Sequence, residues 1–172
     1  MAVLTANSRG SSVTTTGTTW ASTTNAYDGT YGTLSGTYAT LTGAASGTTS
    51  TIKVSGYALA SAIPDNAVLN VLTVTVRSYV VTANRWANPT VQAYVGSTPL
   101  GSAITGTALT TSTTPTPFSV VLTGVTIANI EDPTFSIQLN LIRSGGSTDN
   151  ASVDYLDVSV DYGFENWGSL TI

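Results

Sequence analysis

"VLNVLTVTVRSYVV", residues 68–81, decides the fold class of this chain of 172 residues. Apolar side chains at Leu72, Val74 and Val76 alternate with polar side chains. Successive side chains of an extended strand point to opposite faces, so this alternation is typical of a strand with one buried face and one solvated face. The stretch therefore predicts a long, half-buried β-strand.

The same alternation recurs in FSIQLNLIR, which begins at Phe135, and shorter strand-like runs begin at Ser50, Thr90 and Phe118. Residues typical of turns separate these runs at positions 63–67, 87–89, 112–117, 131–133 and 144–150. No stretch combines a convincing 3.6-residue apolar period with helix caps, and at most Val125–Asp132 is expected to form one short helical turn. The chain is therefore predicted to consist of strands from end to end.

Consecutive strands joined by short loops favour antiparallel pairing, and a chain of this length buries several apolar strand faces by packing two sheets together. We predict an all-β fold, an antiparallel β-sandwich of jelly-roll type, with a closed barrel as the alternative. The sandwich core is expected over residues 51–162, in one domain with the preceding strands, and a C-terminal tail over residues 163–172. Residues 1–50 are rich in Thr, Gly and Ser. They are interpreted either as edge strands and loops or as an extended N-terminal arm that orders against a neighbouring subunit.

Charged residues make up only 8% of the chain, and the formal net charge is -4. An average soluble protein has about 25% charged residues, so this composition favours a protein that packs against neighbours in a large assembly. The five basic residues are scattered, whereas phosphate binding needs clustered Lys and Arg, so no nucleic-acid partner is expected. No segment has the roughly 18 consecutive apolar residues of a membrane span, and the first residues lack the pattern of a signal peptide. We therefore expect no membrane partner and synthesis in the cytoplasm.

The residue types needed for common catalytic sites are scarce. The chain has no His and no Cys, which excludes Ser-His-Asp and Cys-His triads, thiolate chemistry and His-ligated zinc. Lys53 is the only lysine and lies in an apparent strand. The G-x-S-x-G, P-loop and dinucleotide-binding motifs are also absent from the sequence. We predict no catalytic residue, no cofactor-binding residue and no enzyme activity.

The stretch ASVDYLDVSVDY, residues 151–162, is unusual because it holds three aspartates in a chain with few charges. On a regular strand Asp157 and Asp161 face solvent, whereas Asp154 falls near the start on the apolar side. A bulge at Tyr155/Leu156 would turn Asp154 outward and bring residues 153 and 155 into the core. Asp157 and Asp161 stand four residues apart, about 13 Å along a strand, which is too far for the paired carboxylates of a glycosidase. The favoured interpretation is the solvated face of a strand.

A weaker interpretation of the same region is a calcium site. Asp149, Asn150 and Asp154, together with backbone carbonyls of the preceding loop SGGSTDN, would supply the several oxygen ligands that calcium prefers. The spacing does not match an EF-hand loop. Calcium is therefore the one metal for which the sequence offers candidate ligands.

Trp20 and Trp86 stand in or beside loop-like sequence, with tyrosines nearby. Exposed aromatic rings of this kind can stack on sugars. A loop tryptophan of a sandwich can also close the end of the core or pack on a neighbouring chain. Both interpretations stay open from the sequence, and the second is favoured.

Three sequence marks follow one another along the chain. Trp20 precedes AYDGTY at residues 26–31, GYALASAIPDNAVLNVLTVTV occupies residues 56–76, and ASVDYLDVSVDY follows at residues 151–162. This order resembles a β-sandwich module of tailed-bacteriophage virion proteins, including capsid decoration (cement) proteins and minor tail proteins. The resemblance covers Trp20 to Tyr162. It implies a structural protein of the virion that has no enzyme activity and is made in the host cytoplasm.

Two functions follow as expectations. The first is a capsid decoration protein, a homo-oligomer (trimer or dimer) that binds the major capsid protein or another virion protein and stabilises the shell. The second is a carbohydrate- or receptor-binding module of a phage tail or fibre that uses Trp20, Trp86 and nearby tyrosines. In the tail GFENWGSLTI the apolar residues have no strand to belong to, as expected of a segment that orders on a partner. The candidate partner-binding residues are Phe164, Trp167, Leu170, Ile172, Trp20 and Trp86.

Overall fold

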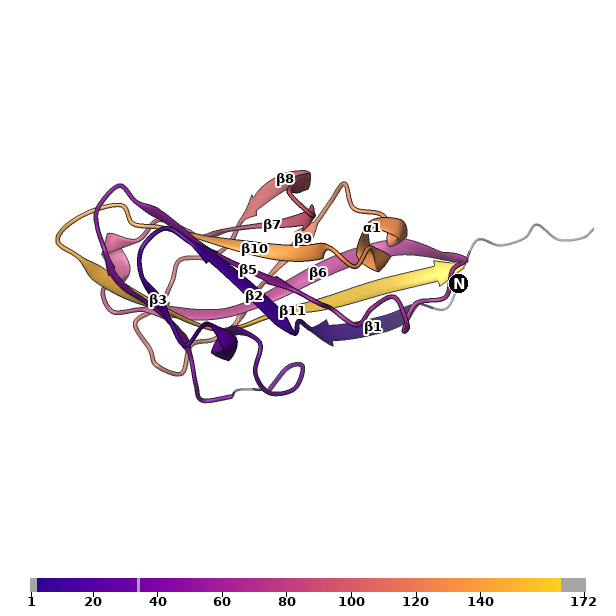
Figure 1. Ribbon diagram of the computed structural model, residues 1–172, viewed down its shortest axis with the longest axis horizontal. Coiled ribbons are helices and arrows are strands. Elements are labelled where there is room, and N and C mark those ends of the chain that lie inside the picture. Colours follow the sequence, from indigo (N-terminus) through magenta and orange to yellow (C-terminus); the bar gives the residue numbers. More distant parts are fainter. Residues whose placement is uncertain (1–2, 34, 165–172) are drawn as a thin grey trace, which may run out of the picture.

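The computed structural model describes residues 3–33 and 35–164 and consists of two antiparallel β-sheets that share one hydrophobic core (Figure 1). Sheet A has the order β3 (Trp20–Ala21), β4 (Ala39–Ala44), β11 (Asp149–Phe164), β6 (Ala67–Val80) and β9 (Phe118–Leu122), and β1 (Leu4–Arg9) also pairs with β11. Sheet B has the order β2 (Ser12–Thr16), β5 (Thr49–Ser55), β10 (Phe135–Ile142), β7 (Thr90–Val95) and β8 (Thr98–Thr105). The predicted all-β sandwich is confirmed.

The strands from β4 to β11 pair in a nested order. β4 pairs with β11, β5 with β10, β6 with β9, and β7 with β8, always antiparallel. This is the order that a long hairpin produces when it rolls up on itself, with the first and last strands together and the middle pair joined by a short turn. The jelly-roll type itself stays a prediction.

The sequence pattern explains how the two sheets meet. On β6, Leu72, Val74 and Val76 are buried in the core while the residues between them face outward, as their alternation predicted. β5 and β10 contribute Ile52 and Leu139 to the same core from sheet B. Burying side chains of this size contributes about 1.5 to 3 kcal/mol each, which makes the core the main source of stability.

Helices are short and lie between strands. α1 (Ile127–Glu131) begins at a capping box in which Thr126 and Asn129 bond each other's backbone N–H, so the predicted helical turn is confirmed. Two 3-10 turns, η1 (Thr23–Ala26) and η2 (Ala83–Arg85), complete the helical elements of residues 3–33 and 35–164. None of the helices in this part of the chain has the length and apolarity to cross a bilayer.

The described residues among the first 50 belong to the sandwich. β1 pairs with β11 and β2 pairs with β5, so their strands extend both sheets. The described residues of this region therefore form the edge strands and loops of the first interpretation and do not extend from the sandwich as an arm. Their Thr-rich sequence fits edge strands, because β-branched residues suit a half-exposed pleated surface.

One edge of β11 is shared by two strands. β4 pairs with its beginning, up to Val153, and β1 pairs with its end, from Asp157 onward. Between them the register of β11 shifts at Asp154, which forms a β-bulge one residue before the predicted position. Residues 22–33 and 35–38, named here the covering segment, lie over this gap and appear as the loops below β3 in Figure 1.

Candidate functional site

Two of the three aspartates within residues 151–162 are buried. Asp154 is fully buried and Asp157 is 1% exposed, so the predicted solvated face is wrong for Asp157. The bulge turns Asp154 away from the core, but the covering segment then closes over both carboxylates. Val153 lies in the core, whereas Tyr155 packs beneath the guanidinium of Arg9, with 4.3 Å between the Arg9 Cζ and the ring centroid. Only Asp161 keeps the expected partial exposure.

Asp157 forms a buried, bidentate ion pair with Arg9. Nε of Arg9 lies 2.6 Å from Oδ1 of Asp157, and its Nη2 lies 2.9 Å from Oδ2. The backbone N–H of Gly32 donates a third hydrogen bond to Oδ2 at 2.7 Å, and Nη1 of Arg9 donates to the carbonyl of Asp28 at 2.6 Å. Both charges are therefore neutralised and hydrogen-bonded, which makes this pair a clamp between β1, β11 and the covering segment rather than a free acid or base.

The carboxylate of Asp154 has fewer compensating partners than that of Asp157. Its Oδ1 accepts a hydrogen bond from Oγ of Ser35 at 2.7 Å, but Oδ2 has no hydrogen-bond partner in the described part of the chain. The nearest cation is Arg77, whose Nε lies 3.9 Å from Oδ2. Burial raises the pKa of the Asp154 carboxyl, although Ser35 and the two nearby arginines act in the opposite direction. A raised pKa suits a general acid, but Asp154 lines none of the three cavities described in this protein.

The calcium candidates do not form one ligand set. Oδ2 of Asp149 accepts hydrogen bonds from the Thr82 N–H and from Nε1 of Trp86, both at 3.1 Å. Oδ1 of Asn150 accepts from the Gly43 N–H at 2.8 Å. Asp154 belongs to the separate network under the covering segment. Within residues 3–33 and 35–164, no three His, Cys, Asp or Glu side chains gather to hold a metal ion.

Trp86 closes the end of the core and is 8% exposed. Its indole N–H is bonded to Asp149, and the fully buried guanidinium of Arg143 lies 5.6 Å from the ring centroid. Arg143 in turn donates to the backbone carbonyls of Arg85 and Ser147. Trp86 was a candidate for partner binding, but its packing inside this chain leaves little of the ring for a partner to contact.

Trp20 and Phe164 also take part in the sandwich. Trp20 is half-buried on β3, packs against the core, and donates from Nε1 to the Thr16 carbonyl at 3.4 Å. Phe164 ends β11, pairs with Ala67, and lies with its ring 6.3 Å from that of Tyr162. The expectation that Phe164 has no strand is therefore wrong. Three other candidates lie outside the described residues: Trp167, Leu170 and Ile172.

One S-x-x-K spacing in the sequence was missed among the catalytic motifs. Ser50 and Lys53 have the S-x-x-K spacing of some serine hydrolases. On strand β5, residues three apart point to opposite faces, so Ser50 is buried beneath the sheet while Lys53 lies on the outer side. Oγ of Ser50 bonds Thr18 instead, at 3.2 Å. These two side chains cannot act as a dyad.

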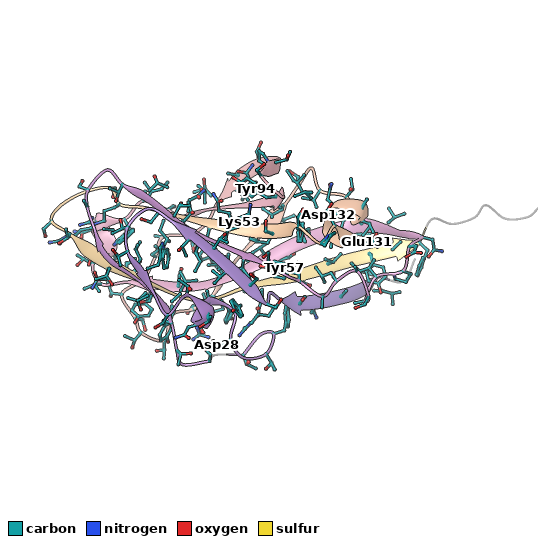
Figure 2. All side chains as sticks on the ribbon, in the orientation of Figure 1. Asp28, Lys53, Tyr57, Tyr94, Glu131 and Asp132 are labelled. Carbon is teal, nitrogen blue, oxygen red and sulfur yellow. The ribbon has the colours of Figure 1, made fainter. Side chains whose placement is uncertain are left out.

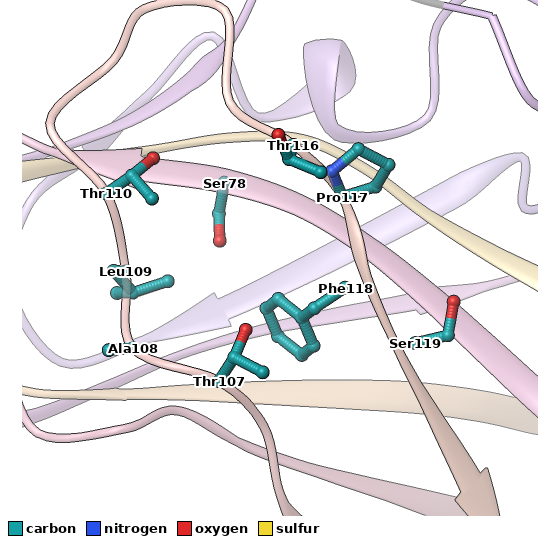
Figure 3. Close-up of a pocket in the computed structure, with 9 residues that line it drawn as sticks. All are labelled: Ser78, Thr107, Ala108, Leu109, Thr110, Thr116, Pro117, Phe118 and Ser119. Atoms are coloured by element: carbon teal, nitrogen blue, oxygen red, sulfur yellow. The ribbon is translucent and has the colours of Figure 1, made fainter.

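A cavity of about 410 Å³ lies where the loop between β8 and β9 passes beside β6 (Figure 3). Ser78 points into it with a buried hydroxyl that has no hydrogen-bond partner among the described residues, and Leu109 and Phe118 flank it. The remaining lining consists of Thr, Ala, Pro and Ser side chains, so the cavity contains no titratable group. Such a pocket can bind a small molecule but cannot transfer a proton.

β6 begins and β11 ends at the same end of the sandwich (Figure 1). Apolar side chains gather there. A groove of about 400 Å³ runs there between the start of β6 and α1, and two exposed residues, Val3 and Leu4, stand at the start of β1. We name this surface the apolar end and define it by Val3, Leu4, Ala67–Leu69 and Val125–Ala128. Sequence reasoning missed it, although the runs AVL and VTIA, each beside a turn, were a signal that could have found it.

Neither a scan against protein-family models nor comparisons with curated proteins and with solved structures gives a match. The function is therefore argued from the residues and their geometry.

Proposed function

We propose that this protein is a non-enzymatic structural protein of a bacteriophage virion, a capsid decoration protein that attaches to the major capsid shell through the apolar end. The observation that carries the proposal is the position of the exposed apolar side chains. Of six large apolar residues that are exposed in the described chain, three belong to this end, namely Val3, Leu4 and Val68. Apolar surface with a groove is typical of protein contacts.

The distribution of charge supports attachment to a protein partner. With 8% charged residues the surface carries few groups that must be desolvated on contact, and none of the residues that form the apolar end is charged. The carboxylates that could have served chemistry are used in the fold, as the Arg9–Asp157 clamp illustrates. The resemblance of the three sequence marks to phage virion sandwiches then favours a capsid as the assembly.

The C-terminal end of β11 favours the same surface. The last described residue, Phe164, ends β11 at the apolar end, and residues 165–172 follow it in the sequence. Their sequence, ENWGSLTI, contains Trp167, Leu170 and Ile172. We propose that these residues add to the contact with the shell. A dimer or trimer would present several copies of the apolar end to a local symmetry axis of the capsid.

The alternative proposal, a carbohydrate- or receptor-binding module of a tail or fibre, rests on binding through the loop tryptophans Trp20 and Trp86. Trp86 offers little of its ring for such binding because it is packed between Asp149 and Arg143. Trp20 is only partly exposed. The decoration role is therefore the better supported of the two.

Co-sedimentation tests the proposal directly. Purified protein is mixed with mature capsids that lack it, from the virus whose genome encodes it, and the pelleted protein is measured as a function of its concentration. We expect saturable binding at a copy number that equals the number of local symmetry sites of the shell. Absence of saturable binding would sink the decoration role and direct attention to the tail.

A further inference from the structure

The outer face of sheet B carries polar side chains in register. The alternation that buries one side of β5, β10 and β7 leaves every second residue on the other side. Cross-strand pairing aligns these residues in two rows, Lys53–Gln138–Gln92 and Ser55–Ser136–Tyr94. This face is opposite to the core and does not include the apolar end.

Hydrogen bonds between side chains hold this face in order. Nε2 of Gln138 donates to Oδ1 of Asn140 at 2.8 Å, and Nδ2 of Asn140 donates to Oγ1 of Thr90 at 2.8 Å. Oη of Tyr94 lies 3.3 Å from Oε1 of Gln92. The side-chain amides of Gln92, Gln138 and Asn140 are named here the amide ladder. Because these hydrogen bonds already fix them in the unbound protein, bonding a ligand would cost the protein little side-chain entropy.

A hollow of about 330 Å³ opens at one end of this face, next to Lys53 and Tyr94 (Figure 2). Ser136 lies in its floor and is 2% exposed, yet its Oγ has no hydrogen-bond partner within the part of the chain that the structure describes. Thr14 and Ser55 add further hydroxyl groups to the wall. Buried hydroxyls are normally paired, so an unpaired one in the floor of a hollow indicates a place for a ligand.

The ammonium of Lys53 stands on the rim of this hollow. Its Nζ donates to the Gly96 carbonyl at 2.6 Å and lies 4.4 Å from the centroid of the Tyr94 ring. Among the described residues, no carboxylate oxygen lies within 4.0 Å of it. Burial lowers the pKa of Lys53, because the ammonium has lost part of its hydration. Two of its three N–H donors are free to bond a ligand.

The residues that line the hollow disfavour several classes of ligand. A metal cation would be repelled by the Lys53 ammonium, and an apolar molecule would leave Lys53 and Ser136 without partners. An anion is disfavoured by the negative charge of Asp132, whose carboxylate accepts hydrogen bonds from the N–H and the hydroxyl of Thr134 in the wall, and by the net charge of -4. A neutral ligand with many hydroxyl groups fits, because it both donates and accepts.

We propose that this hollow binds one residue of a neutral saccharide, whose hydroxyl groups bond Ser136 and Lys53 while the amide ladder holds the adjoining residues. The volume lies within the range of about 300 to 1,000 Å³ that is usual for small-molecule sites. The proposal does not depend on the decoration role, since the apolar end lies on other elements.

An array that carries neutral and acidic bacterial saccharides tests the ligand class. We expect labelled protein to bind one or more neutral saccharides, and titration calorimetry with the best of them to give one site per chain. In a competition control, the protein is applied together with about 10 mM of the free saccharide. This concentration fills most of a site with a Kd of about 1 mM, so binding to the array should fall. Binding to acidic saccharides alone, or to none, would overturn the proposal.

Two variants test the residues. Ser136→Ala and Lys53→Met should each weaken the binding about tenfold or more, because each removes a hydrogen bond to the saccharide. Ser136→Ala should leave thermal stability unchanged or raise it, since its hydroxyl has no partner in the free protein. Thr73→Ala, on the outer face of sheet A, is the matched control and should bind as wild type. Equal affinity of all three variants would contradict the assignment.

Discussion

At the scale of single residues, the buried Arg9–Asp157 pair makes a sharp prediction. Asp157→Asn leaves the Arg9 guanidinium buried without its counter-charge, and breaking such a pair costs about 3 to 5 kcal/mol of unfolding free energy. Asp161→Asn on the same strand removes the same charge from a partly exposed position that bonds only Thr5, so it should cost less than about 1 kcal/mol. Urea unfolding of both variants measures the difference. Similar losses would mean that the clamp contributes no more than a surface contact.

Asp154 should behave in the opposite way. Its folded-state pKa is raised by burial, so the folded protein holds this proton more tightly than the unfolded chain does. Its ionisation therefore lowers stability as the pH rises from about 3.9, the usual unfolded value, through the folded pKa. Asp154→Asn removes that loss. The stability of the variant relative to wild type should increase between about pH 3 and about pH 7, as urea unfolding at both values would reveal. A difference in stability between variant and wild type that stays constant with pH would contradict the raised pKa of Asp154.

At the scale of elements, a glycine contact joins the two sheets along one side. Gly101 on β8 has φ +59, and a Cβ built there would stand 2.0 Å from the carbonyl oxygen of Thr123, just beyond β9. Gly47, between β4 and β5, has φ +79 but nothing within 4 Å of such a Cβ. In both Gly→Ala variants the left-handed backbone lowers the unfolding free energy by about 1 to 2 kcal/mol. Only Gly101→Ala also forces β8 away from the backbone at Thr123.

Gly101→Ala should therefore be less stable than Gly47→Ala by about 1 to 3 kcal/mol in thermal or urea unfolding. Gly47→Ala is the matched control, because it carries the backbone penalty without the steric clash. If the two variants unfold alike, the close approach of β8 to the end of β9 is not a feature of the folded protein.

The elements also differ in how far the sequence predicts them. β6 and β10 were predictable because alternation is a local signal, and α1 because its capping box is local too. The burial of Asp157 was not predictable in this way, since its partner Arg9 stands 148 positions earlier and its cover is a segment without apolar periodicity. Trp86 is a similar case, because Asp149 and Arg143 enclose it only after β10 and β11 have formed.

At the scale of the whole molecule, the sandwich separates its two proposed contacts. The apolar end lies at the tips of β6 and β11, whereas the hollow beside Ser136 lies on the outer face of sheet B. A protein attached to a shell by the apolar end would leave the face of sheet B free for a saccharide. The rigid core between the two surfaces holds each in place without requiring a conformational change in the other.

Capsid co-sedimentation of two variants at opposite ends of β6 tests the central claim most directly. Val68, in the groove of the apolar end, is 37% exposed, and Val81, just past the other end of the strand, is 60% exposed. Val68→Glu places a charge in the proposed contact and should weaken capsid binding at least about tenfold, whereas Val81→Glu should bind as wild type. Both substitutions change the net charge equally. Equal binding of the two variants, or stronger loss with Val81→Glu, would contradict attachment through the apolar end.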